Sequence, residues 1–123
     1  MPTPTPIHLA SIDIAHHTLI AFPDEIDLSN AAPLLAEARA VADLHADGAR
    51  DFIIDLTDTR FLDSQGVRLL LDLRRYLADR YGSSLRVSAP RTGVASRVLT
   101  LTQLRRDVPV HDNLLEALLA REP

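Results

Sequence analysis

Two stripes of opposite character run through residues 67–81, and no other feature constrains the fold as strongly. An apolar face is formed at helical spacing by Val67, Leu70, Leu73, Leu77 and Tyr81. The opposite face is charged, with residues at steps of four, three and four: Arg68, Asp72, Arg75 and Asp79. This pattern predicts an amphipathic helix from Val67 to Tyr81 that buries one side against another element.

A short apolar run precedes this helix. The run Phe-Ile-Ile-Asp-Leu at residues 52–56 is too short for a helix and predicts a buried strand over Asp51–Leu56. Ser64 therefore lies where a strand leads into a helix. The first N–H groups of a helix lack intrahelical partners and its dipole is positive there, so this position suits a capping serine and tolerates a phosphate. Position alone favours an ordinary N-cap, because capping serines are far commoner than regulatory ones.

The first half of the chain predicts a hairpin and a helix. Residues 1–6 alternate Pro and Thr and predict a loose tail, whereas 7–123 predict one domain. We expect an edge strand over 7–14, a turn at His16-His17 and a second strand over 18–22. A polar loop over 24–30 follows, in which Ser29 or Asn30 caps a helix over about 31–46. We expect that helix to end at Asp47-Gly48 and to pair Arg39 with Asp43 on its surface. Its inward face is expected to include Leu34, Ala38 and Val41, and His45 is a further candidate for that face.

The second half predicts further alternation of helices and strands. Gly82-Ser83 turns the chain into a strand over 85–89. Thr92 is expected to cap a helix with an inner face of Val94, Val98, Leu101 and Leu104. Residues 108–110 are expected to form a very short strand or an extended piece, and Asn113 with Glu116 has the spacing of a cap for a helix over 114–119. This order predicts an α/β domain in which an N-terminal β-hairpin leads into a mostly parallel mixed sheet of four or five strands, with about four helices packed against it.

Composition excludes several functional classes. The net charge of −4 argues against a nucleic-acid partner. The chain has no cysteine, and its basic residues are all arginine, so thiolate, Schiff-base and P-loop lysine chemistry are excluded. No apolar run approaches the roughly 20 residues of a membrane span, and no signal peptide is recognised. We therefore expect no membrane partner and a cytoplasmic protein.

The residues offer no clear catalytic or metal site. The five histidines are scattered, and the adjacent pair His16-His17 would point to opposite faces of a strand. Asp55, Asp58 and Asp63 could suggest a Mg²⁺ or aspartyl-phosphate site, although loop and capping roles are favoured because Asp is common in turns. No histidine is an obvious base for Ser64 as a nucleophile. We therefore expect no metal, no cofactor and no enzymatic activity.

The strand-to-helix corner resembles the signature of the STAS domain family. The similarity lies in Asp55-Leu56-Thr57, followed by the run Phe61-Leu62-Asp63-Ser64-Gln65-Gly66-Val67. It is closest to bacterial anti-sigma factor antagonists. Glu25-Ile26-Asp27 resembles the family segment before the first helix, and residues 98–119 resemble its third helix, last strand and last helix. The resemblance covers about residues 8 to 120 in the right order.

The resemblance implies a phosphorylation switch at Ser64. In such proteins the serine directly after the aspartate is phosphorylated by an anti-sigma factor or serine kinase with an ATP-binding fold, and a serine phosphatase resets it. The partner-binding residues it implies are Asp27, Asp63, Ser64, Gln65, Gly66 and Arg68. The chain departs from the family at Gln65, where a second serine is common, and at Asp24, where a glycine is usual. The second departure concerns which anti-sigma partner fits.

Two other functions are weighed beside this one. The domain could be a constitutive STAS scaffold in a larger signalling or transport-associated complex, with Ser64 as a cap only. It could also bind a nucleotide or another small molecule, although the sequence lacks a glycine-rich phosphate cradle. The sequence leaves the oligomeric state open.

Overall fold

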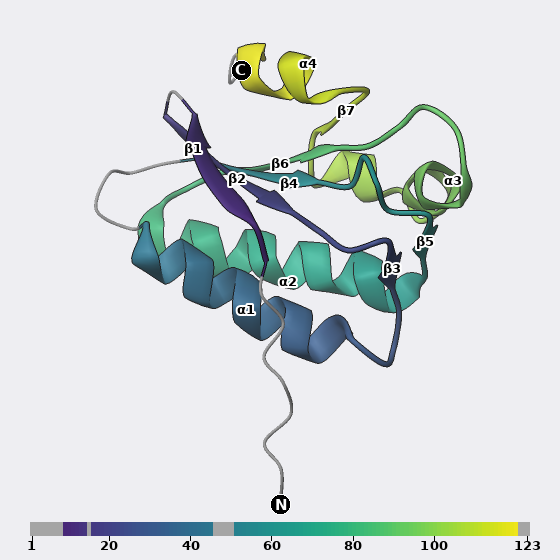
Figure 1. Ribbon diagram of the computed structural model, residues 1–123, viewed down its shortest axis with the longest axis horizontal. Helices are drawn as coiled ribbons and strands as arrows, with labels where there is room; N and C mark the ends of the chain where they lie inside the picture. The colour runs from purple at the N-terminus through teal and green to yellow at the C-terminus, as the bar shows by residue number, and fades with distance from the viewer. Residues whose placement is uncertain (1–8, 15, 46–50, 121–123) are drawn as a thin grey trace, which may run out of the picture.

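A mixed five-stranded sheet forms the centre of the protein. The computed structural model describes residues 9–14, 16–45 and 51–120 (Figure 1). The strands lie in the order β1 (Ser11–Ile14), β2 (His17–Ala21), β4 (Asp51–Asp55), β6 (Leu85–Ser88) and β7 (Val110–His111). β1 and β2 form an antiparallel hairpin, and every later neighbour in the sheet is parallel. The structure thus confirms the predicted fold class and the edge position of the first strand.

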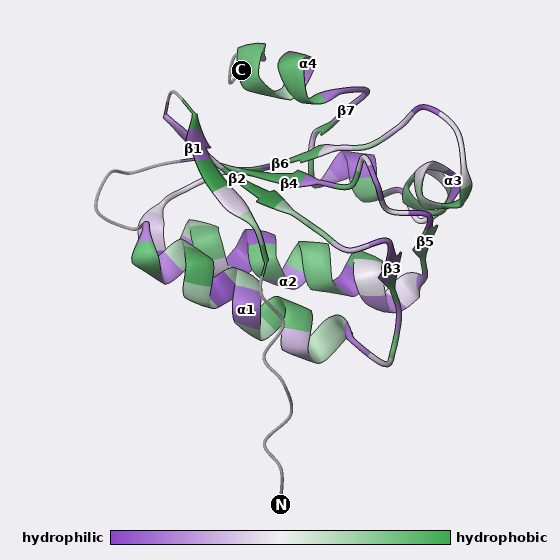
Figure 2. Ribbon diagram, in the orientation of Figure 1, coloured by the Kyte–Doolittle hydropathy of each residue, from purple (hydrophilic) through white to green (hydrophobic). Residues whose placement is uncertain are grey.

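Helices cover both faces of this sheet. α1 (Ala31–Leu44) and α2 (Ser64–Tyr81) lie side by side on one face, α4 (Leu114–Leu119) crosses the other, and α3 (Val94–Leu101) lies near one end (Figure 1). Hydrophobic and hydrophilic segments alternate along α2, as expected for a helix with one buried side (Figure 2). The main core lies between the sheet and the helix pair and includes Ile20, Leu34, Phe52, Ile54, Leu70, Leu73, Leu77 and Val87.

A second, two-stranded sheet was not predicted. β3 (Glu25–Ile26) pairs in parallel with β5 (Phe61–Leu62), and Ile26 is buried. The prediction of a polar loop over 24–30 is therefore wrong at Glu25–Ile26, which form a strand. Two-residue strands carry no readable periodicity, and this pairing joins segments far apart in the sequence.

The first helix begins as predicted but uses its flanking side chains differently. Asn30 occupies the N-cap position, yet its side chain makes no cap hydrogen bond. Instead it accepts from the backbone N–H of Asp27 at 3.0 Å and donates to the carbonyl of Glu25 at 2.7 Å. The helix ends at Leu44, and the predicted stop at residues 47–48 lies outside the described residues. Asn30 therefore holds the loop before the helix rather than the helix itself.

Contacts with neighbouring elements decide the burial of His45 and the partners of Arg39 and Asp43 on α1. Leu34, Ala38 and Val41 are buried, as predicted, while His45 is half-buried and lies 3.2 Å from the Asp13 carboxylate. The predicted pair of Arg39 with Asp43 is not formed. Arg39 lies over the ring of Tyr76, and Asp43 accepts from tyrosine hydroxyls of α2, because these groups of the neighbouring helix lie within reach.

The third helix presents a different face from the one predicted. Its N-cap is Gly93, with φ of +103°, rather than Thr92. Val94 and Leu101 are 44% and 75% exposed, whereas the buried residues are Ala95, Ser96 and Leu99. Leu104 is buried in a following 3₁₀ turn, as predicted. The helix packs against β5 and this turn, and those contacts decide which side is inward.

Most of the remaining boundaries follow local signals, but the last strand lies at Val110–His111 rather than over the expected 108–110. Gly82 has φ of +63° and ends α2 in the left-handed conformation, which confirms the predicted turn. Asn113 caps α4 by accepting from the backbone N–H of Glu116 at 2.9 Å, as predicted. His17 belongs to β2, so the predicted turn at His16-His17 is wrong by one residue.

Candidate functional site

The second helix starts at Ser64, but its cap is the residue before. The carboxylate of Asp63 accepts from the backbone N–H of Gln65 at 2.8 Å and of Gly66 at 3.4 Å. The interpretation of Ser64 as the N-cap is therefore wrong. Asp63 has an extended backbone that lets its side chain fold back over the first turn, and its negative charge suits the positive end of the helix.

The Ser64 side chain is left available by this arrangement. Ser64 is the first residue of α2 and is exposed. Its hydroxyl makes no hydrogen bond within the described part of the chain. A hydroxyl that neither caps the helix nor packs into the core can be reached by another protein.

The small sheet fixes the position of this corner. The backbone N–H of Asp63 donates to the carbonyl of Ile26 at 3.2 Å, and the buried Thr59 hydroxyl donates to the carbonyl of Pro23 at 2.8 Å. The N–H groups of residues 60 and 61 both donate to the carbonyl of Asp24, at 2.7 and 3.1 Å. The loop before α2 is thus tied along its length to the segment before α1.

Gly66 allows the first turn of α2 to approach this sheet closely. It is buried, and a Cβ atom at this position would lie 2.1 Å from Leu62 Cδ1 and 3.1 Å from Ile26 Cγ2. A side chain would therefore push the helix away from β3 and β5. The absence of a side chain at Gly66 thus lets the first turn of α2 pack directly on β3 and β5. Its expected membership of a docking surface stays a prediction.

Asp27 lies in the loop directly after β3. Ile26 is opposite Leu62 in the small sheet, so the same register brings Asp27 next to Asp63. Its carboxylate accepts from the hydroxyl of Ser29 and, at 2.8 Å, from the backbone N–H of Ser29. These bonds, the hydroxyl first, hold the pKa of Asp27 below its ordinary value. Asp27 is therefore ionised at neutral pH and gives the corner a second fixed negative charge.

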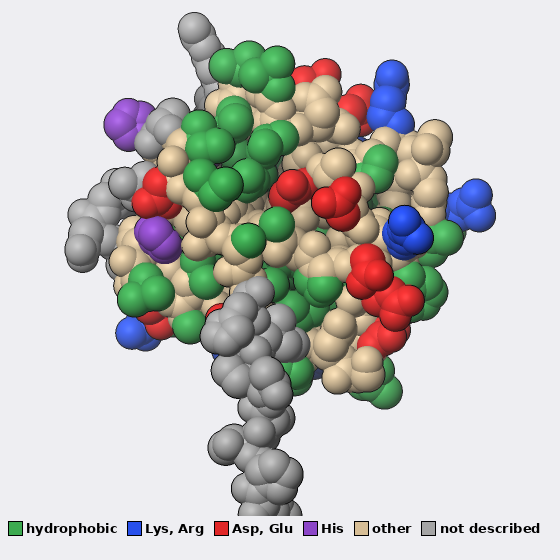
Figure 3. Space-filling view, in the orientation of Figure 1, with side chains coloured by type: hydrophobic (Ala, Val, Ile, Leu, Met, Phe, Trp, Pro, Cys, Tyr) green, Lys and Arg blue, Asp and Glu red, His purple; other side chains and the backbone are tan. Residues whose placement is uncertain are grey.

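The surroundings of the corner are acidic, with exposed apolar residues among them. Acidic side chains gather over the end of the molecule where β3 and β5 lie (Figure 3). A hollow there of about 430 Å³ is lined by Asp24, Thr57, Asp58 and Arg60. Phe61 on β5 and Leu28 after β3 are 43% and 77% exposed.

The aspartates of the corner serve local structure. Asp55 accepts from the hydroxyl and, at 2.9 Å, the backbone N–H of Thr57 in a turn, and Asp63 caps α2. No three His, Asp or Glu side chains gather into a possible metal site anywhere in the described residues. The turn and capping interpretation of Asp55 and Asp63 is confirmed.

The sequence-predicted residues are brought together at the start of α2. Asp27, Asp63 and Gln65 are half-buried, Ser64 and Arg68 are exposed, and Gly66 is buried. The sequence did not reveal that Thr59 is buried or that Ile26 belongs to the small sheet. The available signal was Ile26, one of two apolar residues in the otherwise polar segment 24–30, the other being the exposed Leu28.

Comparison with known proteins identifies the family of this chain. The sequence matches the STAS domain over residues 10–117. This chain belongs to the STAS domain family. A comparison with curated proteins finds no match. No helix in the part of the chain described above is both long and apolar enough to cross a membrane.

Several solved structures share the fold. An anti-sigma factor antagonist from Mycobacterium paratuberculosis is 24% identical, with a TM-score of 0.77 and coverage of 90% of each chain. An anti-sigma-factor antagonist (STAS) domain protein from Planctomyces limnophilus is 20% identical, with a TM-score of 0.73 and coverage of 90% of this chain and 94% of that one. The murine anion transporter Slc26a9 is 16% identical with a TM-score of 0.67, over 88% of this chain and 18% of the transporter.

Proposed function

We propose that this STAS domain is a cytoplasmic anti-sigma factor antagonist that works by partner switching and has no enzymatic activity. Unmodified, it would bind an anti-sigma factor with a kinase-type ATP fold and so free a sigma factor. Phosphorylation of Ser64 by that partner or a related kinase would release it, and a phosphatase would reset it. One observation carries the proposal: the exposed Ser64 hydroxyl is free, because Asp63 caps the helix in its place.

The position of Ser64 suits a phosphate without unfolding of the domain. A phosphoserine adds about −1.5 to −2 charges, and a helix N-terminus stabilises negative charge. Because Ser64 contributes no cap hydrogen bond, its modification removes none. The switch would therefore act on the surface, and the fold would stay intact.

The same charge would oppose binding of a partner at this surface. It would be added close to the carboxylates of Asp63 and Asp27, in the middle of the proposed docking surface of residues 27, 63–66 and 68. A partner that docks there must desolvate the phosphate as well as the two carboxylates. A loss of several kcal/mol in binding is expected, and each 1.4 kcal/mol is tenfold in affinity.

Binding and mass measurements together test the proposal. Ser64→Ala is expected to bind a cognate anti-sigma factor tightly and Ser64→Asp weakly, whereas Ser11→Asp, an exposed serine on β1, should bind as the wild type does. Intact mass after incubation with candidate kinases and ATP should show one phosphate that is absent in Ser64→Ala. Equal, tight binding by both Ser64 variants would contradict the switch.

A constitutive scaffold is the second candidate. The likeness to a domain-sized part of the Slc26a9 transporter favours it, since the fold also occurs as one part of a longer chain. A scaffold predicts stable co-purification with a larger complex and no phosphate at Ser64 in protein isolated from cells. The free hydroxyl weighs against it, because a scaffold needs no unengaged serine beside an aspartate cap.

A further inference from the structure

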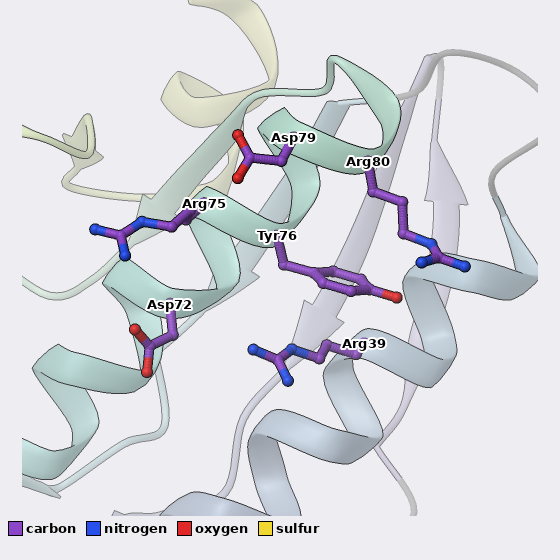
Figure 4. Close-up of a pocket in the computed structure, with 6 residues that line it drawn as sticks. All are labelled: Arg39, Asp72, Arg75, Tyr76, Asp79 and Arg80. Atoms are coloured by element: carbon purple, nitrogen blue, oxygen red, sulfur yellow. The ribbon is translucent and has the colours of Figure 1, made fainter.

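Apart from Arg68, the charged stripe of α2 has no role in the proposed switch. Its members are Arg68, Asp72, Arg75 and Asp79, which lie on the opposite side of the helix from the buried Leu70, Leu73 and Leu77. Arg68, Arg75 and Asp79 are exposed and Asp72 is half-buried. Figure 4 shows Arg75 and Asp79 pointing to one side of α2 while Tyr76 and Arg80 point to the other. The stripe therefore faces away from the domain.

The four charges are not used within the domain. Spacing of three and four residues would let neighbours pair along the helix. Among the residues that the structure describes, however, none of the four forms an ion pair. By contrast, Arg80 on the neighbouring side of the helix lies 3.8 Å from the Asp43 carboxylate. The stripe thus presents two cations and two anions to solvent.

The order of these charges is self-complementary. Residues 68 and 79 lie equally far from the point between residues 73 and 74, and so do residues 72 and 75. If two α2 helices pack antiparallel about a twofold axis at that point, Arg68 faces Asp79 of the second copy and Asp72 faces its Arg75. Every charge then meets its opposite, and a twofold axis repeats each contact.

We infer that the outward face of α2 is a homodimer interface, formed antiparallel with a second copy of this chain. A parallel pair in register would place like charges together, so the pattern selects the antiparallel arrangement. A hollow of about 630 Å³ beside the stripe is lined by Arg39, Asp72, Arg75, Tyr76, Asp79 and Arg80, and it gives an opposing side chain room to enter (Figure 4).

The charges also predict the strength of this dimer. Exposed ion pairs contribute little each and are screened by salt, so association is weak and depends strongly on ionic strength. The stripe extends over about 16 Å of helix, a narrow contact. The inference goes beyond the proposed switch and does not need Ser64. Only Arg68 belongs to both surfaces, so the inner residues Asp72 and Arg75 test the dimer separately.

The test is sedimentation equilibrium of the full chain at about 10 mM ionic strength, where the Debye length is about 30 Å. The wild type should form dimers that dissociate at about 0.5 M salt. Asp72→Arg and Arg75→Asp should each raise the dissociation constant at least tenfold, because they place like charges opposite each other. An equimolar mixture of the two variants should form a heterodimer, since its pairs are again opposite in charge. Arg74→Asp, next to the stripe, is the matched control and should dimerise like the wild type.

Three results would overturn the inference. They are a wild type that stays monomeric at low salt, a dimer that salt or the single variants leave unchanged, and a mixture that stays monomeric although circular dichroism shows both variants folded. If either variant is unfolded, Arg68→Glu and Asp79→Arg provide a second mixture with the same logic. Loss of dimerisation leaves Ser64 phosphorylation measurable by intact mass, so failure of either proposal is recognised without the other.

Discussion

The two ends of α2 use a carboxylate in opposite ways. At the N-terminus, Asp63 accepts from backbone N–H groups, and the neighbouring Ser64 side chain stays unengaged. At the C-terminus, Asp43 of α1 accepts from the hydroxyl of Tyr81 and, at 2.8 Å, from that of Tyr76. The bonds from Tyr81 and then Tyr76 hold the pKa of Asp43 below its ordinary value.

The two carboxylates differ in the kind of donor that each engages. The Asp43 carboxylate accepts hydrogen bonds from side chains and so links α1 to α2, whose two tyrosine rings pack edge to face with centroids 6.3 Å apart. The Asp63 carboxylate accepts only from backbone N–H groups, which need a partner at the start of any helix. The C-terminal carboxylate therefore engages side chains of α2, whereas the N-terminal one caps the helix and leaves the Ser64 hydroxyl exposed.

The largest expected effect concerns the close packing at the N-terminal end. Gly66→Ala should destabilise the domain by about 2 kcal/mol, because overpacking against Leu62 outweighs the gain of about 1 kcal/mol in helix propensity. Chemical denaturation measures it. In a Leu62→Ala background the same change should cost much less, since the clashing atoms are gone. An equal cost in both backgrounds would show that the contact with Leu62 is not the cause.

The cap itself should have the next largest effect. Asp63→Ala removes the acceptor for two backbone N–H groups and should cost about 1 kcal/mol of unfolding free energy, whereas Asp63→Asn should recover most of it. Denaturation midpoints of the three proteins measure this. If Asp63→Ala is as stable as the wild type, Ser64 or water must cap in its place, and the contrast between the two ends fails.

The Asp43 carboxylate at the C-terminal end of α2 should make the stability of the domain depend on pH. Because the folded pKa of Asp43 is lowered, its stabilisation is present above the unfolded pKa near 4 and is lost as pH falls through the folded value. Asp43→Asn should therefore be less stable than the wild type by tenths of a kcal/mol at neutral pH, with the difference shrinking below about pH 4. Thermal unfolding across pH measures this, with Asp107→Asn as the charge-matched control. A constant difference would rule out ionisation as its source.

The smallest effect belongs to the residue of greatest functional interest. Ser64→Ala should change stability by less than about 0.5 kcal/mol, since an exposed hydroxyl without hydrogen bonds is removed. Paired denaturation with Asp63→Ala makes the comparison direct. A loss for Ser64→Ala as large as that for Asp63→Ala would return Ser64 to a capping role.

Much of the fold could be predicted because its signals are local. The periodicity of residues 67–81 predicted α2, and the spacing of Asn113 and Glu116 predicted the cap of α4. Predictions failed where the deciding neighbour is distant. Leu101 was expected inside but is exposed, because contacts with β5 and the 3₁₀ turn set the inner side of α3. The small sheet was missed because neither two-residue strand has a pattern of its own.

For the site, the sequence by itself determined that Ser64 stands at the start of a helix, in a motif that resembles a known family. Only the tertiary structure decided that Asp63 is the cap and that Asp27 lies beside it. The physical reason is that both aspartate and serine can cap, and the choice depends on the backbone angles at residue 63. The pairing of β5 with β3 fixes the position of that residue, and it forms only when the chain is folded.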